Sequence, residues 1–325
     1  MPEVRVDPLT GRRTIVAGDR AGRPGGGLSC TPPDPIDPEH DPFLEGHEDR
    51  TPPELYRAGG GAPDTPGWTV RVVPNLYPAL TPDAAALERD ANPDLFSASA
   101  ARGSHEVVIN APQPLVSLSQ VGSPQVAAAV DVWRKRIRHH TAAGAAYVHV
   151  IVNERREGGA SLPHTHAQVY ALPFVPAQLA RERERFGAYA TRTMGGNLLG
   201  DLVQEEVRRR ERIVAVDDEA VLMAPYASRL PFQLLLAPRR PQPRFEDDAT
   251  GAALLHDALN RLARRFGSPP PLNLWVRTAP PGADHFGWRI DIVPRVTHLA
   301  GLEMGAGVNL NIVSPEQAAA ELRDA

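Results

Sequence analysis

Apolar residues in the first half of the chain follow strand spacing in three places and helix spacing in one. Runs rich in β-branched residues, bounded by turn-forming residues, favour strands. Between the second and third runs, apolar residues recur at helical intervals after a Ser-Pro pair that is typical of a helix start. We therefore predict strands at 68–74, 105–110 and 146–152, and a helix that begins at Ser123 and runs through His140.

The second half repeats this order of elements. A helix is expected at 249–266, a strand at 272–277 and a second strand within 285–295, and an offset of 123 residues aligns them with the first half. Two polar segments, 178–189 and 198–212, are predicted to be helices that link the halves, with their charge runs on solvated faces. The Pro- and Gly-rich stretch from about 24 to 65 is expected to be a long loop.

The chemically distinctive stretch runs from Asn153 to Pro173. It contains His164, His166 and Gln168 at alternate positions before an apolar run, so we expect all three on one face of a strand. The preceding loop holds Gly158, Gly159 and Ser161, whose backbone N–H groups could approach an anion. Imidazoles beside a phosphate-binding loop indicate phosphoryl chemistry. The same offset places Gly287, Arg289 and Asp291 at the corresponding positions of the second half.

Composition excludes several classes of protein. The chain has 325 residues, a formal net charge of -4 and a pI near 6.3, so no global positive field favours nucleic acid or an acidic membrane. No run of about 18 apolar residues occurs, and we expect a cytoplasmic protein. The single cysteine, Cys30, excludes an internal disulfide and a zinc site built from several thiolates. An anionic ligand must therefore meet local cations, for which Arg20 and Arg23 are candidates, although most arginines are simply solvated.

The duplicated strand-helix-strand unit with its His-x-His-x-Gln motif resembles the histidine triad superfamily. It is most similar to the galactose-1-phosphate uridylyltransferase branch, in which Gln replaces the third histidine. Further blocks resemble that family in the same order, at 46–54, 71–80, 103–107, 292–295 and 300–307, so the resemblance covers nearly the whole chain. It implies an α+β fold of two tandem histidine-triad-like halves, 1–174 and 175–325, each an antiparallel sheet with packed helices.

The resemblance also implies a role for each matching residue. His166 would be the nucleophile that attacks the α-phosphorus of a nucleotide sugar, and Gln168 would bond the phosphoryl oxygens. His164 would either orient the site or only pack within it. The remaining matches would hold the nucleotide and its phosphates (Asn75, Asn153, Gly159, Ser161), serve the site across a homodimer interface (Arg20, Arg23) or receive sugar hydroxyls (Glu303).

The chain departs from the family at the metal positions. Many members hold a structural zinc with a Cys-x-x-Cys pair, a later histidine and the first histidine of the motif. Here Asp41 to Leu44 occupy the cysteine segment and Pro114 the position of the later histidine, so only His164 remains. Gly287 and Arg289 likewise replace the histidines of a second metal site. We predict a protein without metal cofactors, with a substitute site at Cys30, His40, His47 or His105 as the alternative.

The expected function is nucleotidyl transfer between a nucleoside diphosphate sugar and a sugar 1-phosphate, most simply UDP-glucose and galactose 1-phosphate. A neutral imidazole is nucleophilic near pH 7 because its unperturbed pKa is about 6.5. Glutamine is not a general acid, which disfavours hydrolysis of the intermediate. The alternatives are an ADP-sugar phosphorylase or adenylyltransferase and a non-catalytic nucleotide-sugar binding protein, which would not need His166. Leu302, where tyrosine is frequent in the family, indicates an altered sugar pocket.

Overall fold

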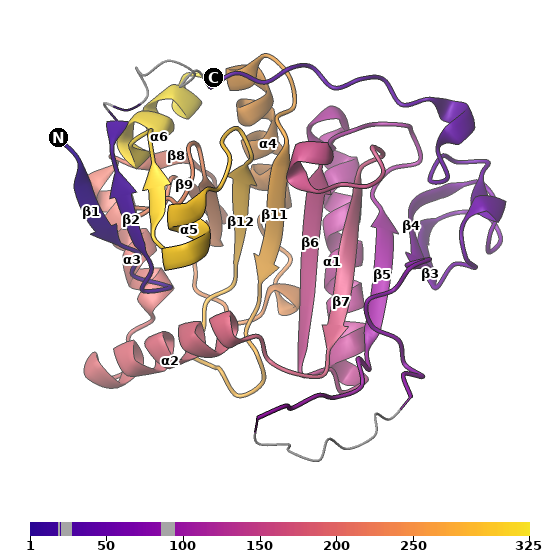
Figure 1. Cartoon of the computed structure of the whole chain (residues 1–325), viewed down its shortest axis with the longest axis horizontal. Helices are drawn as coiled ribbons and strands as arrows, with labels where there is room; N and C mark the ends of the chain where they lie inside the picture. Colours follow the sequence, from indigo (N-terminus) through magenta and orange to yellow (C-terminus); the bar gives the residue numbers. More distant parts are fainter. Residues whose placement is uncertain (19, 21–27, 86–94) are drawn as a thin grey trace.

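A sheet of ten strands crosses the whole molecule (Figure 1). The structure, a computed structural model, describes residues 1–18, 20, 28–85 and 95–325. Each pair of neighbouring strands in the large sheet is antiparallel. The strands lie in the order β3 (Tyr56–Gly59), β4 (Trp68–Pro74), β5 (Ser104–Ile109), β7 (His166–Leu172), β6 (Tyr147–Glu154), β11 (Leu272–Arg277), β12 (Arg289–Pro294), β10 (Leu234–Pro238), β9 (Ala220–Met223) and β8 (Ile213–Val216).

The described residues also form a second, three-stranded sheet and six α-helices. In the small sheet, β1 (Glu3–Val6) pairs with β2 (Arg13–Val16) antiparallel and β13 (Asn309–Asn311) pairs with β2 parallel. The helices are α1 (Ser123–Ala142), α2 (Ala177–Arg192), α3 (Leu198–Arg209), α4 (Ala252–Phe266), α5 (Gly301–Ala306) and α6 (Pro315–Arg323). None of the helices in the described residues has the length and apolar composition needed to cross a membrane.

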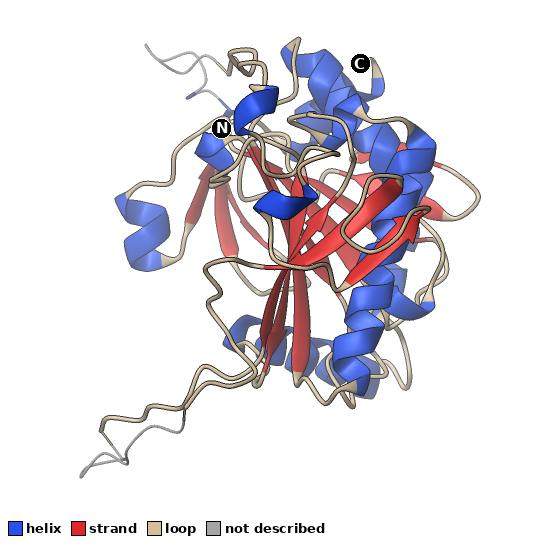
Figure 2. Cartoon of the chain, turned by 90° about the vertical axis from the view of Figure 1, so that its right-hand side faces the viewer, coloured by secondary structure: helices blue, strands red, loops and turns tan. Residues whose placement is uncertain are grey.

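Helices α1 and α4 cover one face of the large sheet (Figure 2). On α1, Trp133 and Ile137 are no more than 1% exposed and belong to the same core as Ala167 and Val169 of β7. Because side chains alternate along a strand, His166, Gln168 and Tyr170 must point to the opposite face. The packing of α1 therefore determines on which side of the sheet the motif stands.

The sheet order is the same from either edge, which relates the two halves. Strands β3-β4-β5-β7-β6 run inward from one edge and β8-β9-β10-β12-β11 from the other, with β6 and β11 paired at the centre. The offset of 123 residues places His166, the first residue of β7, on Arg289, the first residue of β12. The two sheets that we expected, one in each half, are thus one continuous sheet, because β6 and β11 bond to each other. The boundary between 174 and 175 stays a prediction.

Several expected elements differ in detail from the structure. Helix α1 begins at Ser123 as predicted but ends at Ala142, two residues beyond His140. Strand β7 begins at His166, so His164 precedes the strand instead of sharing its face. The charge runs of α2 and α3 are not wholly solvated, because Glu182 and Glu206 are at most 2% exposed and pair with Arg289 and Arg212. The strands β8, β9 and β10 were not anticipated.

Candidate active site

His166 lies at the start of β7 on the face that α1 does not cover. Its Nδ1 is 2.8 Å from the carbonyl oxygen of His164, which accepts a hydrogen bond only if Nδ1 carries the proton. Burial lowers the pKa of His166, against the opposing effect of this hydrogen bond, so the ring is neutral at pH 7. No hydrogen bond from the described residues occupies Nε2. The arrangement therefore presents Nε2 as an unprotonated, nucleophilic nitrogen.

Gln168 stands two residues further along β7, and its carboxamide has a fixed orientation. Its Oε1 accepts hydrogen bonds from Nε2 of His105, at 2.9 Å, and from the hydroxyl of Tyr170, at 2.7 Å. Nδ1 of His105 in turn accepts from the backbone N–H of Ala79, which places the proton on Nε2. With its oxygen bonded twice, Gln168 keeps its NH₂ group available to donate to a phosphoryl oxygen.

The sequence named His105 only as a possible ligand of a substitute metal site, and it did not single out Tyr170; the structure makes both functional candidates beside Gln168. They are directly opposite each other on β5 and β7, and their rings stack with centroids 4.1 Å apart. Nδ2 of Asn75 lies 3.2 Å from Nε2 of His105, so the structure brings Asn75 into the same group. For Tyr170 the available signal was its position two residues after Gln168, which places it on the face of the motif.

Asn153 joins the site to the second half of the chain. It lies at the seam of the sheet opposite Asn273 of β11, whose Nδ2 donates to Oδ1 of Asn153 at 2.7 Å and to the Gly158 carbonyl at 2.6 Å. Nη1 of Arg295 donates to Oδ1 of Asn273 at 2.9 Å. Sequence reasoning missed Asn273, although an amide in an otherwise apolar strand was visible. These contacts leave the NH₂ group of Asn153 free for a ligand.

The loop before the motif differs from the expected phosphate cradle. It forms the short helix η5 (Arg156–Gly158), and the N–H groups of Gly158, Gly159 and Ala160 bond to carbonyls within the turn. Gly159 has φ +89°, and a Cβ on Gly158 would lie 2.7 Å from the Leu272 carbonyl, so both positions need glycine. The glycines shape the loop rather than offering free donors. Among the residues that we expected here, Ser161 is exposed and keeps an unbonded N–H and hydroxyl.

His164 is completely buried and does not face the site. Its Nδ1 lies 2.7 Å from Oδ2 of Asp41 and its Nε2 lies 2.8 Å from the carbonyl of Ala111. Both contacts are hydrogen bonds only if the His164–Asp41 pair holds two protons in total. Phe43 packs its ring edgewise against both His164 and His166, with centroids 6.1 and 5.3 Å apart. His164 is thus an orienting residue whose backbone carbonyl holds His166.

The expected zinc position does not fit a metal ion. Asp41 and His164 bond directly to each other, while Leu44 and Pro114 have no donor atoms. Among the described residues, no group of three or more His, Cys, Asp or Glu side chains is placed to hold a metal. The residues of the proposed substitute site have other neighbours, since His47 contacts the Asp41 carbonyl, His105 contacts Gln168, and Cys30 accepts from Arg155.

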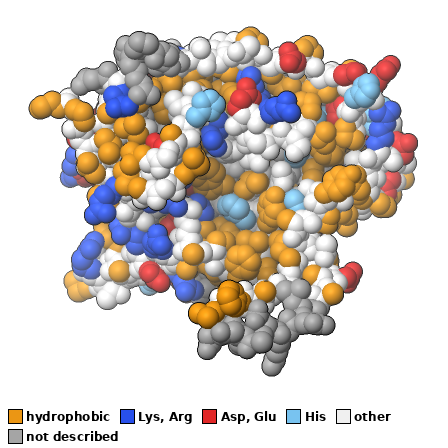
Figure 3. Space-filling model, viewed as in Figure 1, with side chains coloured by type: hydrophobic (Ala, Val, Ile, Leu, Met, Phe, Trp, Pro, Cys, Tyr) orange, Lys and Arg blue, Asp and Glu red, His pale blue; other side chains and the backbone are white. Residues whose placement is uncertain are grey.

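Among the described residues, no hydrogen bond or ion pair joins Arg20 or Glu303 to the His166 group. Arg20 is exposed, and Arg23 lies outside the described residues. Glu303, on α5, lines a separate cavity together with arginines of the N-terminal segment and α2. Seen from the side that α1 does not cover, hydrophobic and histidine side chains surround a hollow near the centre, and Lys and Arg side chains gather to one side of it (Figure 3).

The fold and the His-x-His-x-Gln motif are those of the histidine triad superfamily. The family model for the N-terminal domain of galactose-1-phosphate uridyl transferase matches residues 1–176, and a domain of unknown function, DUF4921, matches 126–324. A galactose-1-phosphate uridylyltransferase of Cryptococcus neoformans is 30% identical over 98% of this chain and 89% of its own. The chain belongs to the galactose-1-phosphate uridylyltransferase family.

Another relative of comparable similarity has a different activity. An ADP-glucose phosphorylase of Arabidopsis thaliana is 29% identical over 99% of this chain and 93% of its own. The crystal structure of an ADP-glucose phosphorylase from that plant, with bound ADP-glucose, superposes with a TM-score of 0.82 at 28% identity, covering 100% of this chain and 99% of the other. Family membership alone therefore leaves the nucleotide and the acceptor open.

Removing the Asp41 carboxylate tests the role of the His164–Asp41 pair. We expect Asp41→Ala to lower the free energy of unfolding by about 3–5 kcal/mol, because it leaves a buried, polar His164 ring without its partner. Urea denaturation followed by circular dichroism measures the change. Asp37→Ala is the matched control, since Asp37 lies the same 2.7 Å from His40 on the surface. Equal unfolding midpoints for the two variants would contradict this role.

Proposed function

We propose that the protein transfers a nucleotidyl group from a nucleoside diphosphate sugar, through a covalent intermediate on His166. The supporting observation is the pairing of a neutral, buried imidazole with a free Nε2 and a fixed glutamine amide on the same strand face. A pure binding protein does not require a nucleophile held in this tautomer. Asn75, Asn153 and Ser161 are the proposed ligands of the nucleotide and its phosphates.

In the first step, the Nε2 lone pair of His166 attacks the α-phosphorus. The N–P bond forms as the bond between that phosphorus and the bridging oxygen breaks, and the sugar 1-phosphate leaves. The ring becomes cationic, and the His164 carbonyl, which accepts from Nδ1, stabilises this charge. The NH₂ group of Gln168 donates to a phosphoryl oxygen as negative charge develops there. Because His105 and Tyr170 already hold its oxygen, little reorientation accompanies the reaction.

In the second step, a phosphate oxygen of the acceptor attacks the same phosphorus and breaks the N–P bond. With a hexose 1-phosphate as acceptor, the enzyme is a UDP-glucose–hexose-1-phosphate uridylyltransferase, acting most simply on galactose 1-phosphate. With inorganic phosphate and ADP-glucose it is a phosphorylase. The second candidate is favoured by the likeness along the whole chain to an ADP-glucose phosphorylase.

The proposed homodimer gives Arg20 and Glu303 a role. The cavity that Glu303 lines contains none of the described residues of the His166 group. Glu303 would therefore contact a sugar bound at His166 only from a second copy of the chain. Light scattering tests this arrangement, with the expected mass being twice 35.1 kDa.

The donor and acceptor can be identified by trapping the intermediate. We expect one of UDP-glucose, ADP-glucose and GDP-mannose to add a single nucleotidyl group, seen by intact-mass spectrometry after an acid-free quench. His166→Gly should abolish the adduct, whereas His40→Gly, at a surface histidine, should keep it. Discharge of the adduct by galactose 1-phosphate then indicates the uridylyltransferase, and discharge by inorganic phosphate indicates the phosphorylase. Absence of an adduct with every donor would contradict the proposal and favour a binding protein.

The network behind Gln168 predicts a rate effect for a residue that does not touch the phosphorus. His105→Ala should slow formation of the adduct about tenfold, the equivalent of one hydrogen bond, while the Kd of the donor changes little. His105→Gln should restore most of the rate, because its Nε2 can donate to Gln168 in place of the imidazole. Tyr77→Phe, at an exposed neighbour, is the control. A weaker donor affinity at an unchanged rate would show that His105 only shapes the nucleotide site.

A further inference from the structure

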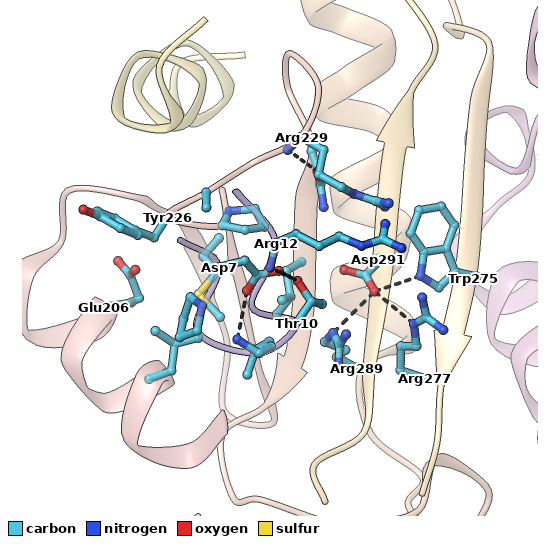
Figure 4. Close-up of a pocket in the computed structure, with 18 of the residues that line it drawn as sticks. Asp7, Thr10, Arg12, Glu206, Tyr226, Arg229, Trp275, Arg277, Arg289 and Asp291 are labelled. Carbon is cyan, nitrogen blue, oxygen red and sulfur yellow. Dashed lines mark hydrogen bonds and ion pairs between the residues drawn. The ribbon is translucent and has the colours of Figure 1, made fainter. Parts of the chain in front are cut away.

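A second cavity lies on the same face of the sheet, in the half that has lost the histidines. It lies between β11, β12 and the turn from Asp7 to Arg12 (Figure 4). Its floor contains Asp291, which corresponds to Gln168 under the offset of 123. The two residues lie in one row across the sheet, separated by Ile151 and Trp275. Three strand spacings put them roughly 14 Å apart, so this cavity is separate from the His166 site.

Four guanidinium groups meet in this cavity around the Asp291 carboxylate. They belong to Arg12, Arg229, Arg277 and Arg289 (Figure 4). Oδ2 of Asp291 accepts from Nε1 of Trp275 at 2.9 Å and lies 3.3 Å from Arg289 Nε and 3.7 Å from Arg277 Nε. One carboxylate therefore stands among four positive charges.

The other carboxylates nearby are already engaged. Glu182 bonds Arg289 at 2.9 Å, and Glu206 pairs with Arg212, which does not line the cavity. Asp7 accepts from the Leu9 N–H at 2.9 Å and from the Thr10 hydroxyl at 2.6 Å, so it closes its own turn. Even with Asp7, Asp291 and Glu182 all set against the four arginines, the cavity keeps one positive charge in excess.

Several of the arginine nitrogens are buried without a hydrogen-bond partner. Arg277 and Arg289 are 6% and 2% exposed. Among the described residues, Nη1 of Arg289 has no hydrogen-bond partner, and Nε of both arginines makes only the longer ion-pair contacts with carboxylates and no hydrogen bond. Arg229 places its guanidinium 5.0 Å from the centre of the Trp275 ring and makes no side-chain hydrogen bond within the described residues. Burial, together with the like charges of Arg12 and Arg277, lowers the pKa of Arg229 despite the attraction of Asp291.

A purely structural ion network is the simpler interpretation, but it does not account for these features. Each unsatisfied buried donor destabilises the fold by about 1–3 kcal/mol. Arginine forks match phosphate and carboxylate oxygens, which could satisfy several of these donors at once. Water would satisfy the donors but would leave the excess charge uncompensated.

We propose that this cavity binds a small oxyanion, a phosphoryl or carboxylate group, held by Arg229, Arg277 and Arg289 against the face of Trp275. The duplicated half would thus have exchanged a reactive site for a binding site on the corresponding strand. The proposal does not depend on the donor or acceptor of the His166 reaction.

Thermal unfolding with inorganic phosphate as the probe tests the proposal, with sodium chloride at equal ionic strength as the reference. We expect phosphate at roughly twenty times its Kd to raise the Tm of the wild-type protein by about 2 °C. Arg229→Gln should abolish this rise in Tm, because the Arg229 side chain would bind the anion and makes no hydrogen bond with the described residues of the fold. If Arg229→Gln does not fold, Arg12→Gln at the rim of the cavity replaces it as the test variant and should reduce the rise in Tm. Succinate in place of phosphate shows whether a carboxylate can be the ligand.

Two further variants locate the effect. Arg240→Gln removes an exposed arginine outside the cavity and should leave the rise unchanged. Asn153→Ala alters the His166 site and should also leave it unchanged. The proposal is overturned if phosphate stabilises Arg229→Gln and the wild-type protein equally, if Asn153→Ala alone abolishes the effect, or if neither phosphate nor succinate exceeds chloride.

Discussion

The hydrogen bond between Nδ1 of His166 and the backbone carbonyl of His164 is the contact on which the site depends. It determines which nitrogen carries the proton and which is left to react. The carbonyl can hold this position because the His164 ring is fixed on both sides, by Asp41 and by the carbonyl of Ala111. A buried pair of side chains, His164 and Asp41, thus supplies the rigidity of this carbonyl. This support from His164 and Asp41 requires no change at His166 itself.

The second constraint is the pairing of β6 with β11, which makes one sheet out of two related halves. It places Asn273 against Asn153, so the half without the His-x-His-x-Gln motif still supports the half that carries it. It also aligns two unlike pockets in a single row, with an imidazole and an amide in one half and a cluster of arginines in the other. Duplication of a strand-helix-strand unit preserved the backbone and the helix-packed face. The side chains on the face that α1 and α4 do not cover diverged.

The sequence predicted the scaffold where local pattern determines it. Strands β4 and β11 begin and end at the predicted residues, and α1 and α4 lie within a few residues of the expected ranges. The strands β8 to β10 escaped because short apolar runs beside long charged helices have no distinctive period. Of the proposed site, His166, Gln168, Asn75 and Asn153 were predicted from the sequence, and the structure places them on one face of the sheet. The contact of His105 with Gln168 and that of Asn273 with Asn153 were not predicted, because they depend on strand register between distant segments. Likewise, no sequence pattern could show that the glycine loop uses its own N–H groups.

The most direct test of this account is to locate the phosphorus on the histidine ring. The protein would be labelled with ¹⁵N-histidine, loaded with the productive donor and studied by ³¹P and ¹⁵N magnetic resonance. The account predicts a phosphorus–nitrogen coupling to Nε2 of His166, with Nδ1 still protonated and bonded to the His164 carbonyl. A coupling to Nδ1, or to any nitrogen outside His166, would contradict it.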